Sequence, residues 1–160
     1  MSLKVEGRMK SEFYVATVAN AYRHAIDEYL QTGKIENAAK YNADLETVAH
    51  RTYTDAYFEG DNLDTVCLDE GQSPEKYIFT AVVQNVENGI VTVEMRNRFK
   101  SGETLFVLSP DHNDGKSFTL GAITHTSDNT LTYDAKLVQH SYSFACPLNL
   151  NSGDILLKEN

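Results

Sequence analysis

The 160-residue sequence contains no tryptophan, only three prolines and two cysteines, and no long hydrophobic run. Cys67 and Cys146 are too few for a disulfide framework or for a four-thiolate zinc site. No apolar run approaches the ~18 residues that a membrane-spanning helix needs. Residues 1–10 carry charged side chains in place of the apolar stretch of a signal peptide. These absences argue against a disulfide-rich secreted protein, and we expect a protein of the reducing cytoplasm with no membrane partner.

Hydrophobic residues make up 41% of the chain, which is enough for one ordinary domain with its own core. The formal net charge is -9, and it is unevenly distributed. Residues 1–51 carry seven basic and seven acidic side chains, residues 52–75 seven acidic and no basic ones, and residues 76–160 seven basic and nine acidic ones. The negative net charge argues against a chain whose whole surface binds nucleic acid, but its uneven distribution still allows a local basic patch.

The acidic residues 52–75 also contain Gly60, Gly71 and Pro74, a composition that is typical of a connector between folded parts. A solvated linker is the simpler interpretation and is favoured. A calcium site is the alternative, because acidic side chains at positions 59, 61 and 64 surround Gly60, although the spacing of an EF-hand loop is absent.

The pattern from Ser11 to Gly33 predicts one amphipathic helix. Ser11 suits the N-cap, and Gly33 suits the position after the last helical turn. Apolar side chains recur at intervals of three or four residues and form one stripe. Its members are Val15, Val18, Tyr22, Ile26 and Tyr29.

A second, shorter helix is expected at about residues 44–50. Asn42 or Asp44 would be its cap, and Leu45 and Val48 would face inward. The two helices together would make residues 1–51 a helical arm.

After residue 76 the hydrophobic period changes from that of a helix to that of a strand. Val91, Val93 and Met95 alternate with polar residues, which is typical of a strand with one buried face. Asn88-Gly89 is a strong hairpin signal, because both residues tolerate a positive φ. The expected strands are residues 77–86, 91–96, 104–108, 118–125, 130–133, 142–146 and 155–157.

Seven short strands within residues 76–160 favour a small barrel or a sandwich. Similar Ser-Gly-acid turns at residues 101–103 and 152–154 each precede a strand, as in the small barrel of the second domain of translation elongation factors. We therefore expect an α+β chain in three parts. They are a helical arm at 1–51, an acidic connector at 52–75, and a small closed, antiparallel-rich β-barrel of about six or seven strands at 76–160.

Catalytic and metal-binding motifs are not found in the sequence. The five histidines are scattered, and none is paired at the i, i+4 spacing of a helical metal site. Cys146 is expected to be a core thiol, and the carboxylates near Cys67 oppose a thiolate there. Hydrolysis by this chain alone would require a cysteine or serine to meet a histidine in the fold, and it is the least favoured hypothesis.

Three basic residues at a spacing of two, Arg96, Arg98 and Lys100, are expected to project from one face at the end of a strand. Together with Phe99 they form a candidate nucleic-acid site, in which the cations bind phosphates and the ring stacks on a base. A solvated strand edge, on which charges discourage pairing with another sheet, is the alternative.

Several segments resemble the collagenase-like peptidase family U32, and the resemblance spans nearly the whole chain. The matching segments are residues 4–11 (KVEGRMKS), 14–18 (YVATV), 21–27 (AYRHAID), 48–54 (VAHRTYT), 57–60 (YFEG) and 93–99 (VEMRNRF). Thr52 and Ala56 stand where the family usually has glycines. The family's catalytic barrel and its cysteine-containing signature precede these segments, so we expect this chain to be a C-terminal part of a longer protein.

The resemblance implies roles for particular residues. Glu6 and Arg8 would bind substrate or cofactor in the intact protein, because residues 4–10 resemble the end of the family's catalytic barrel. An ion-paired barrel rim is the alternative interpretation of the same two residues. Without the rest of the barrel, neither role can operate in this chain.

The resemblance also implies an activity for the longer protein. Family members act as collagenase-like proteases or hydroxylate a base of transfer or ribosomal RNA with iron or an iron–sulfur centre. We expect the strand region to be a non-catalytic accessory domain that helps an upstream catalytic domain to bind RNA or protein, with no cofactor of its own. A structural or oligomerisation module is the alternative, and residues 11–30 would then form a homodimer.

Overall fold

The computed structural model describes residues 4–51, 53–54, 71 and 73–160. The chain divides into two compact units, residues 1–76 and residues 77–160. Most of the expected acidic connector lies outside the described residues, and so do the calcium alternative and Cys67.

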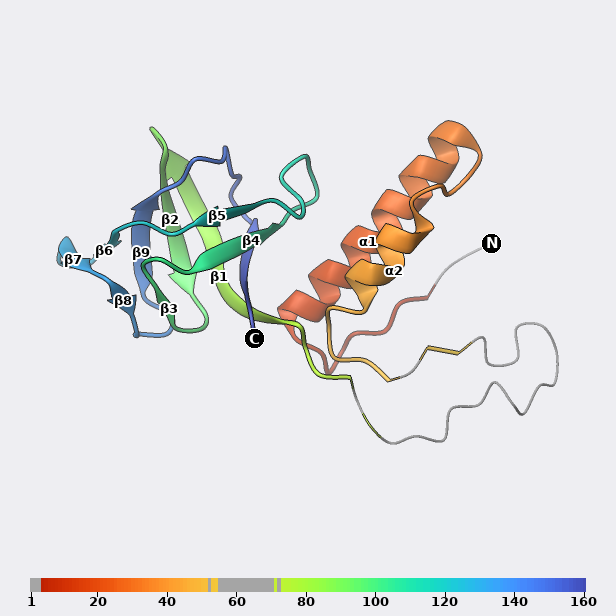
Figure 1. Cartoon of the computed structure of the whole chain (residues 1–160), viewed down its shortest axis with the longest axis horizontal. Coiled ribbons are helices and arrows are strands. Elements are labelled where there is room, and N and C mark those ends of the chain that lie inside the picture. Colours follow the sequence, from red (N-terminus) through yellow and green to blue (C-terminus); the bar gives the residue numbers. More distant parts are fainter. Residues whose placement is uncertain (1–3, 52, 55–70, 72) are drawn as a thin grey trace. The chain divides into compact units, whose positions relative to one another are not determined.

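The first unit contains the predicted long helix, α1 (Glu12–Thr32), coloured red to orange in Figure 1. The Ser11 hydroxyl accepts a hydrogen bond from the backbone N–H of Tyr14, at 3.2 Å. Gly33 ends the helix in the left-handed conformation, at φ 75°, and its N–H bonds to the carbonyl of Tyr29. Both predicted helix ends are confirmed, because each depends on a residue adjacent to the helix.

The predicted apolar stripe of α1 is not its buried face. Val18 is buried, but Val15, Tyr22 and Tyr29 are exposed, with 46, 42 and 55% of their surface accessible. The residues that α1 buries are Phe13, Thr17, Val18 and Ala21. The helix therefore presents a row of large apolar side chains on its accessible side.

The second helix, α2 (Ala38–Leu45), begins six residues earlier than expected and packs beside α1. Glu28 of α1 accounts for the difference, because its carboxylate accepts hydrogen bonds from the backbone N–H groups of Glu36 and Asn37 and from the Tyr41 hydroxyl. The N-terminus of α2 is thus held by another helix instead of by a local cap. Val48 is fully buried, as expected, in the turn that follows.

The second unit is built from ten strands, of which β1 is the longest, with eleven residues. They are β1 (Tyr77–Glu87), β2 (Ile90–Met95), β3 (Phe99–Lys100), β4 (Thr104–Leu108), β5 (Ser117–Thr119), β6 (Ile123–His125), β7 (Thr130–Thr132), β8 (Asp134–Ala135), β9 (Ser141–Ala145) and β10 (Ile155–Glu159). Asn88 and Gly89 form the turn between β1 and β2 with φ angles of 51° and 78°, so the predicted hairpin is confirmed.

Eight of these strands form one curled antiparallel sheet in the order β5-β4-β10-β1-β2-β9-β6-β7, and β3 pairs with β8 in a second, two-stranded sheet (Figure 1). The predicted α+β class is confirmed. The predicted closure of the barrel is not confirmed. Within residues 77–160, all of which the structure describes, no pairing joins β5 to β7. The two edge strands have only three residues each, and they leave an open, curled sheet where we expected a closed barrel.

One hydrophobic core fills the curled sheet. Its members come from seven of the eight strands of the large sheet and from the small sheet, and they include Val93, Met95, Phe99, Leu105, Phe144 and Leu156. Among the described residues, neither helix is long and apolar enough to cross a membrane.

Candidate nucleic-acid interface

The small β3–β8 sheet carries a cluster of charged side chains that we call the basic corner. Its members are Arg98, Lys100, Glu103, Asp134, Lys136 and Lys158. In the antiparallel pairing of β3 with β8, Lys100 lies opposite Asp134 and Phe99 lies opposite Ala135. Four basic and two acidic side chains give the corner a formal charge of +2 within a chain of -9.

Arg98 and Asp134 form the centre of the basic corner. The Nε and Nη2 groups of Arg98 donate to the two carboxylate oxygens of Asp134, at 2.8 and 2.6 Å. Lys136 lies 3.4 Å from the same carboxylate. The hydrogen bond from Arg98 and the charges of Arg98 and Lys136 hold the pKa of Asp134 far below its usual range. The carboxylate therefore stays ionised and fixes the guanidinium on an exposed surface.

Lys158 connects the basic corner to the last strand of the large sheet. Its Nζ donates to the backbone carbonyl of Arg98, at 2.8 Å, and lies 3.4 Å from a Glu103 carboxylate oxygen. The other oxygen of Glu103 accepts the backbone N–H of Lys100, at 2.8 Å. These bonds fix the β3 turn, while the side chains of Lys100 and Lys136 remain exposed to solvent.

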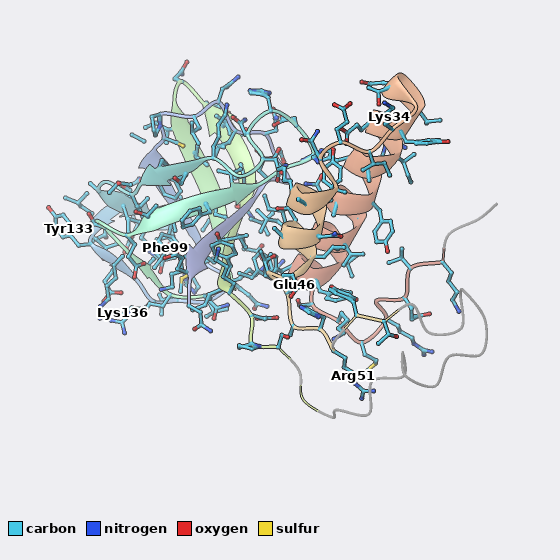
Figure 2. All side chains as sticks on the ribbon, turned by 45° about the vertical axis from the view of Figure 1, so that its right-hand side comes forward. Lys34, Glu46, Arg51, Phe99, Tyr133 and Lys136 are labelled. Atoms are coloured by element: carbon cyan, nitrogen blue, oxygen red, sulfur yellow. The ribbon has the colours of Figure 1, made fainter. Side chains whose placement is uncertain are left out.

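Phe99 is not the aromatic residue of this surface. Its ring is fully buried and packs edge-to-face against Tyr142 and Phe144, with ring centroids 5.8 and 6.3 Å apart. The expectation that Phe99 stacks on a base is therefore corrected: the ring belongs to the core. The exposed aromatic side chain is Tyr133, with 65% of its surface accessible, and Figure 2 shows it at the same end of the unit as Lys136.

Arg96 has surroundings different from those of the basic corner. Its guanidinium lies 3.3 Å from the Glu94 carboxylate and 5.8 Å from the centre of the Phe79 ring. The alternation that predicted one row of three cations ends with β2, because the backbone bends after Met95. The structure thus groups Arg98 and Lys100 with side chains from β8 and β10, and it gives Arg96 partners on β1 and β2.

Glu6 and Arg8 lie exposed in the segment before α1. The backbone N–H of Arg8 donates to the Glu6 carboxylate at 3.3 Å, and Lys4 lies 3.9 Å from its other oxygen. The Nζ of Lys10 donates to the backbone carbonyl of Ala49, at 3.1 Å. Two segments that are far apart in the sequence, residues 4–10 and 46–51, are therefore joined within the first unit.

His50 lies buried in the second of these segments. Its Nδ1 is 2.7 Å from the Arg51 carbonyl, its Nε2 is 3.0 Å from the Glu46 carboxylate, and its ring stacks on Tyr53 at 4.3 Å. Both ring nitrogens thus lie within hydrogen-bond distance of oxygen atoms of the chain itself. This arrangement serves packing, since it leaves neither nitrogen for a ligand.

A cysteine nucleophile is not favoured by the described residues. Burial raises the pKa of the Cys146 thiol, which opposes formation of a thiolate. In the described part of the chain, no group of three or more histidine, cysteine or acidic side chains is arranged to hold a metal ion. These residues therefore do not fit an iron or iron–sulfur site.

Of the six residues of the basic corner, the sequence predicted only Arg98 and Lys100. Asp134, Lys136 and Lys158 lie 36 to 60 positions after Arg98, on or next to strands β8 and β10, and no local spacing links them to it. The sequence did contain a signal for the burial of Phe99. Side chains alternate along a strand, so a strand that directs Arg98 and Lys100 outward directs Phe99 inward.

The fold and this surface define a class of protein: an α+β chain with a helical hairpin and a curled antiparallel sheet that bears an exposed basic corner. The model of Peptidase family U32 matches residues 1–66, and the model of the Peptidase family U32 C-terminal domain matches residues 75–156. The chain belongs to peptidase family U32, as its sequence motifs indicated.

Three curated proteins illustrate the relationship. The chain is 35% identical to tRNA hydroxylation protein P1 of Bacillus subtilis, over 69% of this chain and 27% of that protein. It is 29% identical to tRNA hydroxylation protein P of Haemophilus influenzae, over 99% of this chain and 34% of that protein. It is 33% identical to tRNA hydroxylation protein P of Escherichia coli, over 70% and 25%. The chain thus spans about a third or less of the length of these relatives.

Among solved structures, the chain is similar to the C-terminal domain of a Geobacillus thermoleovorans protein assigned as a U32 peptidase. The identity is 23%, the match covers 51% of this chain and 92% of that one, and the TM-score is 0.48.

Proposed function

We propose that this chain is the C-terminal part of a U32 protein that acts in tRNA hydroxylation in the cytoplasm. In this proposal the sheet unit is a non-catalytic accessory domain that binds RNA for an upstream catalytic domain. The basic corner carries the proposal, because Arg98, Lys100 and Lys136 gather on one exposed surface beside Tyr133 in an otherwise acidic chain. Exposed cations next to an aromatic ring are the elements of single-stranded RNA binding. The names of the curated relatives support the choice of tRNA.

The same proposal assigns roles to the first unit. Glu6 and Arg8 would contact substrate or cofactor in the whole protein, where the rest of the catalytic domain surrounds them. Any iron or iron–sulfur centre of the whole protein would take its ligands from elsewhere, since the described residues offer no such set. Proteolysis by the whole protein and hydrolysis by this chain alone are weaker alternatives, because the described residues present no activated nucleophile.

The exposed stripe of α1 supports a further part of the proposal. Val15, Tyr22, Ile26 and Tyr29 are each more than a third exposed, which is unusual for four large apolar side chains on one helix face. We propose that they contact the upstream domain in the whole protein. When the 160-residue chain is alone, the same stripe would pair with a second copy, which is the oligomerisation alternative.

The RNA-binding proposal is tested by measuring tRNA affinity of the 160-residue chain at several salt concentrations. The variant Arg98→Ala/Lys100→Ala should bind more weakly, and the slope of log K against log salt should fall by about 1.4, which is the change expected for two contacts to single-stranded phosphates. The control Lys34→Ala/Lys40→Ala removes the same charge from the helical unit and should leave the slope unchanged. Equal slopes for both variants, or the absence of tRNA binding by the unaltered chain, would refute the proposal.

A further inference from the structure

A pocket of about 340 Å³ opens in the sheet unit directly beside the basic corner. Asp134 and Lys136 belong to both, so the pocket and the corner form one continuous surface. The volume lies at the lower end of the range of about 300–1,000 Å³ that is usual for ligand sites. It therefore suits one small ring system with a few substituents.

Two aromatic side chains form a wall of the pocket. His125 and Tyr142 line it with their ring centroids 5.0 Å apart. Tyr142 is almost fully buried, and its hydroxyl accepts the backbone N–H of Leu137, at 3.2 Å. Leu137 adds an apolar side chain to the lining. The wall is therefore fixed in position, and its accessible ring is that of His125, whose side chain is 15% exposed.

Hydrogen bonds on both sides fix the His125 ring. Its Nδ1 lies 3.1 Å from the Asp128 carboxylate, and its Nε2 lies 2.9 Å from Nδ1 of His140, whose ring lies edge to edge with it and nearly in the same plane. Because an ionised carboxylate only accepts, Nδ1 of His125 carries the proton in this arrangement. Hydrogen bonds from Thr130 and His125 lower the pKa of Asp128 and keep it ionised. The ring therefore presents its face and not a free nitrogen.

The remaining lining is polar and can recognise the edge of a ring. The Thr130 hydroxyl donates to the Asp128 carboxylate, and the Thr132 hydroxyl donates to the backbone carbonyl of Asp134, at 3.2 Å, so what these side chains offer a ligand is oxygen acceptors. Nucleobases carry amino and ring N–H donors beside carbonyl and ring nitrogen acceptors, and RNA-binding proteins recognise splayed-out bases by stacking together with such edge contacts. Lys136 at the shared border places a cation where the adjoining phosphate would lie.

We propose that this pocket binds one unstacked nucleobase of a single-stranded RNA whose phosphates lie along the basic corner. The proposal rests on the RNA-binding function proposed above and adds a base-dependent contact to its charge-dependent one. The cations of the corner respond to phosphate charge, and the pocket, like the exposed Tyr133 ring, responds to the presence of a base.

The test compares a short single-stranded RNA with an abasic RNA of the same length and charge. The 160-residue chain should bind the base-containing strand about tenfold more tightly, as expected for one stacked base. The variant Thr130→Phe fills the pocket from an exposed position of edge strand β7 and should lower this preference to the part that stacking on Tyr133 contributes. The variant should retain the affinity for the abasic strand and the slope of log K against log salt. This retained binding also shows that the variant folds.

The control Thr119→Phe places the same ring at an exposed position on β5, the opposite edge of the sheet, and should keep the preference. Salt-dependent binding without any preference for bases would overturn the pocket proposal and leave the RNA-binding function intact. An equal preference in the chain and in Thr130→Phe would also overturn it. If the chain binds neither strand, the RNA-binding function itself fails.

Discussion

Arg98 and Asp134 form a two-point ion pair, in which Nε and Nη2 of the arginine lie 2.8 and 2.6 Å from the two carboxylate oxygens. The pair joins the turn before β3 to β8 on an exposed surface, and more than half of the Arg98 side chain is accessible. A guanidinium held in this way is ready for a phosphate, but it already has an anionic partner. Asp134 therefore positions Arg98, and under the proposed function it would also compete with RNA for this side chain.

Replacing Asp134→Asn should strengthen RNA binding. The change removes the competing anion from Arg98 and Lys136 and raises the formal charge of the corner by one. The slope of log K against log salt should steepen by about 0.7, the value for one further contact to a single-stranded phosphate. Titrations of labelled tRNA at several salt concentrations measure both quantities. Asp27→Asn is the matched control, because Asp27 pairs with Arg23 on α1 and its loss should leave the slope unchanged.

The Asp134 carboxylate should make the stability of the sheet unit depend on pH in the acid range. Because the folded-state pKa of Asp134 is lowered, its contribution is present above the unfolded-state pKa, near 4, and is lost as the pH falls below it. Urea unfolding of the chain and of Asp134→Asn should therefore differ most at neutral pH. The two free energies of unfolding should converge toward acid, and a difference that stays constant from neutral pH down through the acid range would contradict the assignment.

Tyr133 and Phe99 should respond to substitution in opposite ways. Tyr133→Ala removes an exposed ring and should weaken binding of single-stranded RNA by about 1–3 kcal/mol while hardly changing stability. Phe99→Leu leaves a gap in the core and should lower the free energy of unfolding by about 1–3 kcal/mol. The folded fraction of Phe99→Leu should bind RNA normally. Denaturant unfolding and fluorescence anisotropy on both variants separate the two effects, and weaker RNA binding by folded Phe99→Leu would restore the original expectation.

Features that depend on neighbouring residues could be predicted from the sequence. Ser11 and Gly33 determine the ends of α1, and Asn88-Gly89 determines the first hairpin, because the cap and turn geometries need only these residues. The α+β class followed from the change in hydrophobic period after residue 76.

Features that depend on distant residues could not be predicted in this way. The start of α2 depends on Glu28, eight or more positions before the groups that it binds. The basic corner depends on the register of β3 with β8, two strands too short to show a period. Only Arg98 and Lys100 of this cluster had a local signal, so the sequence indicated a basic strand end but not its partners.

The link from Glu28 to α2 leads to a prediction for the helical unit. Burial alone would raise the pKa of Glu28, but hydrogen bonds from Tyr41, Asn37 and the backbone of Glu36 outweigh it and lower the pKa. Glu28→Ala removes these acceptors and should unfold α2, with a loss of helical circular dichroism that corresponds to its eight residues. Glu12→Ala, in the first turn of the same helix α1, is the control. If Glu28→Ala keeps its full helical signal, the N-terminus of α2 does not need this carboxylate.

The accessible stripe of α1 leads to a prediction about assembly. Tyr22 and Tyr29 are 42 and 55% exposed, and burial of such rings in a second copy would remove apolar surface from water. The 160-residue chain should therefore have the mass of a dimer in light scattering, and Tyr22→Glu/Tyr29→Glu should be a monomer, since each new charge would be buried without a partner. The control Asn20→Glu/Gln31→Glu adds the same charge on other faces of α1 and should remain dimeric. A monomeric mass for the unaltered chain would show that the stripe does not pair two copies, and its partner would then have to be sought in the upstream domain.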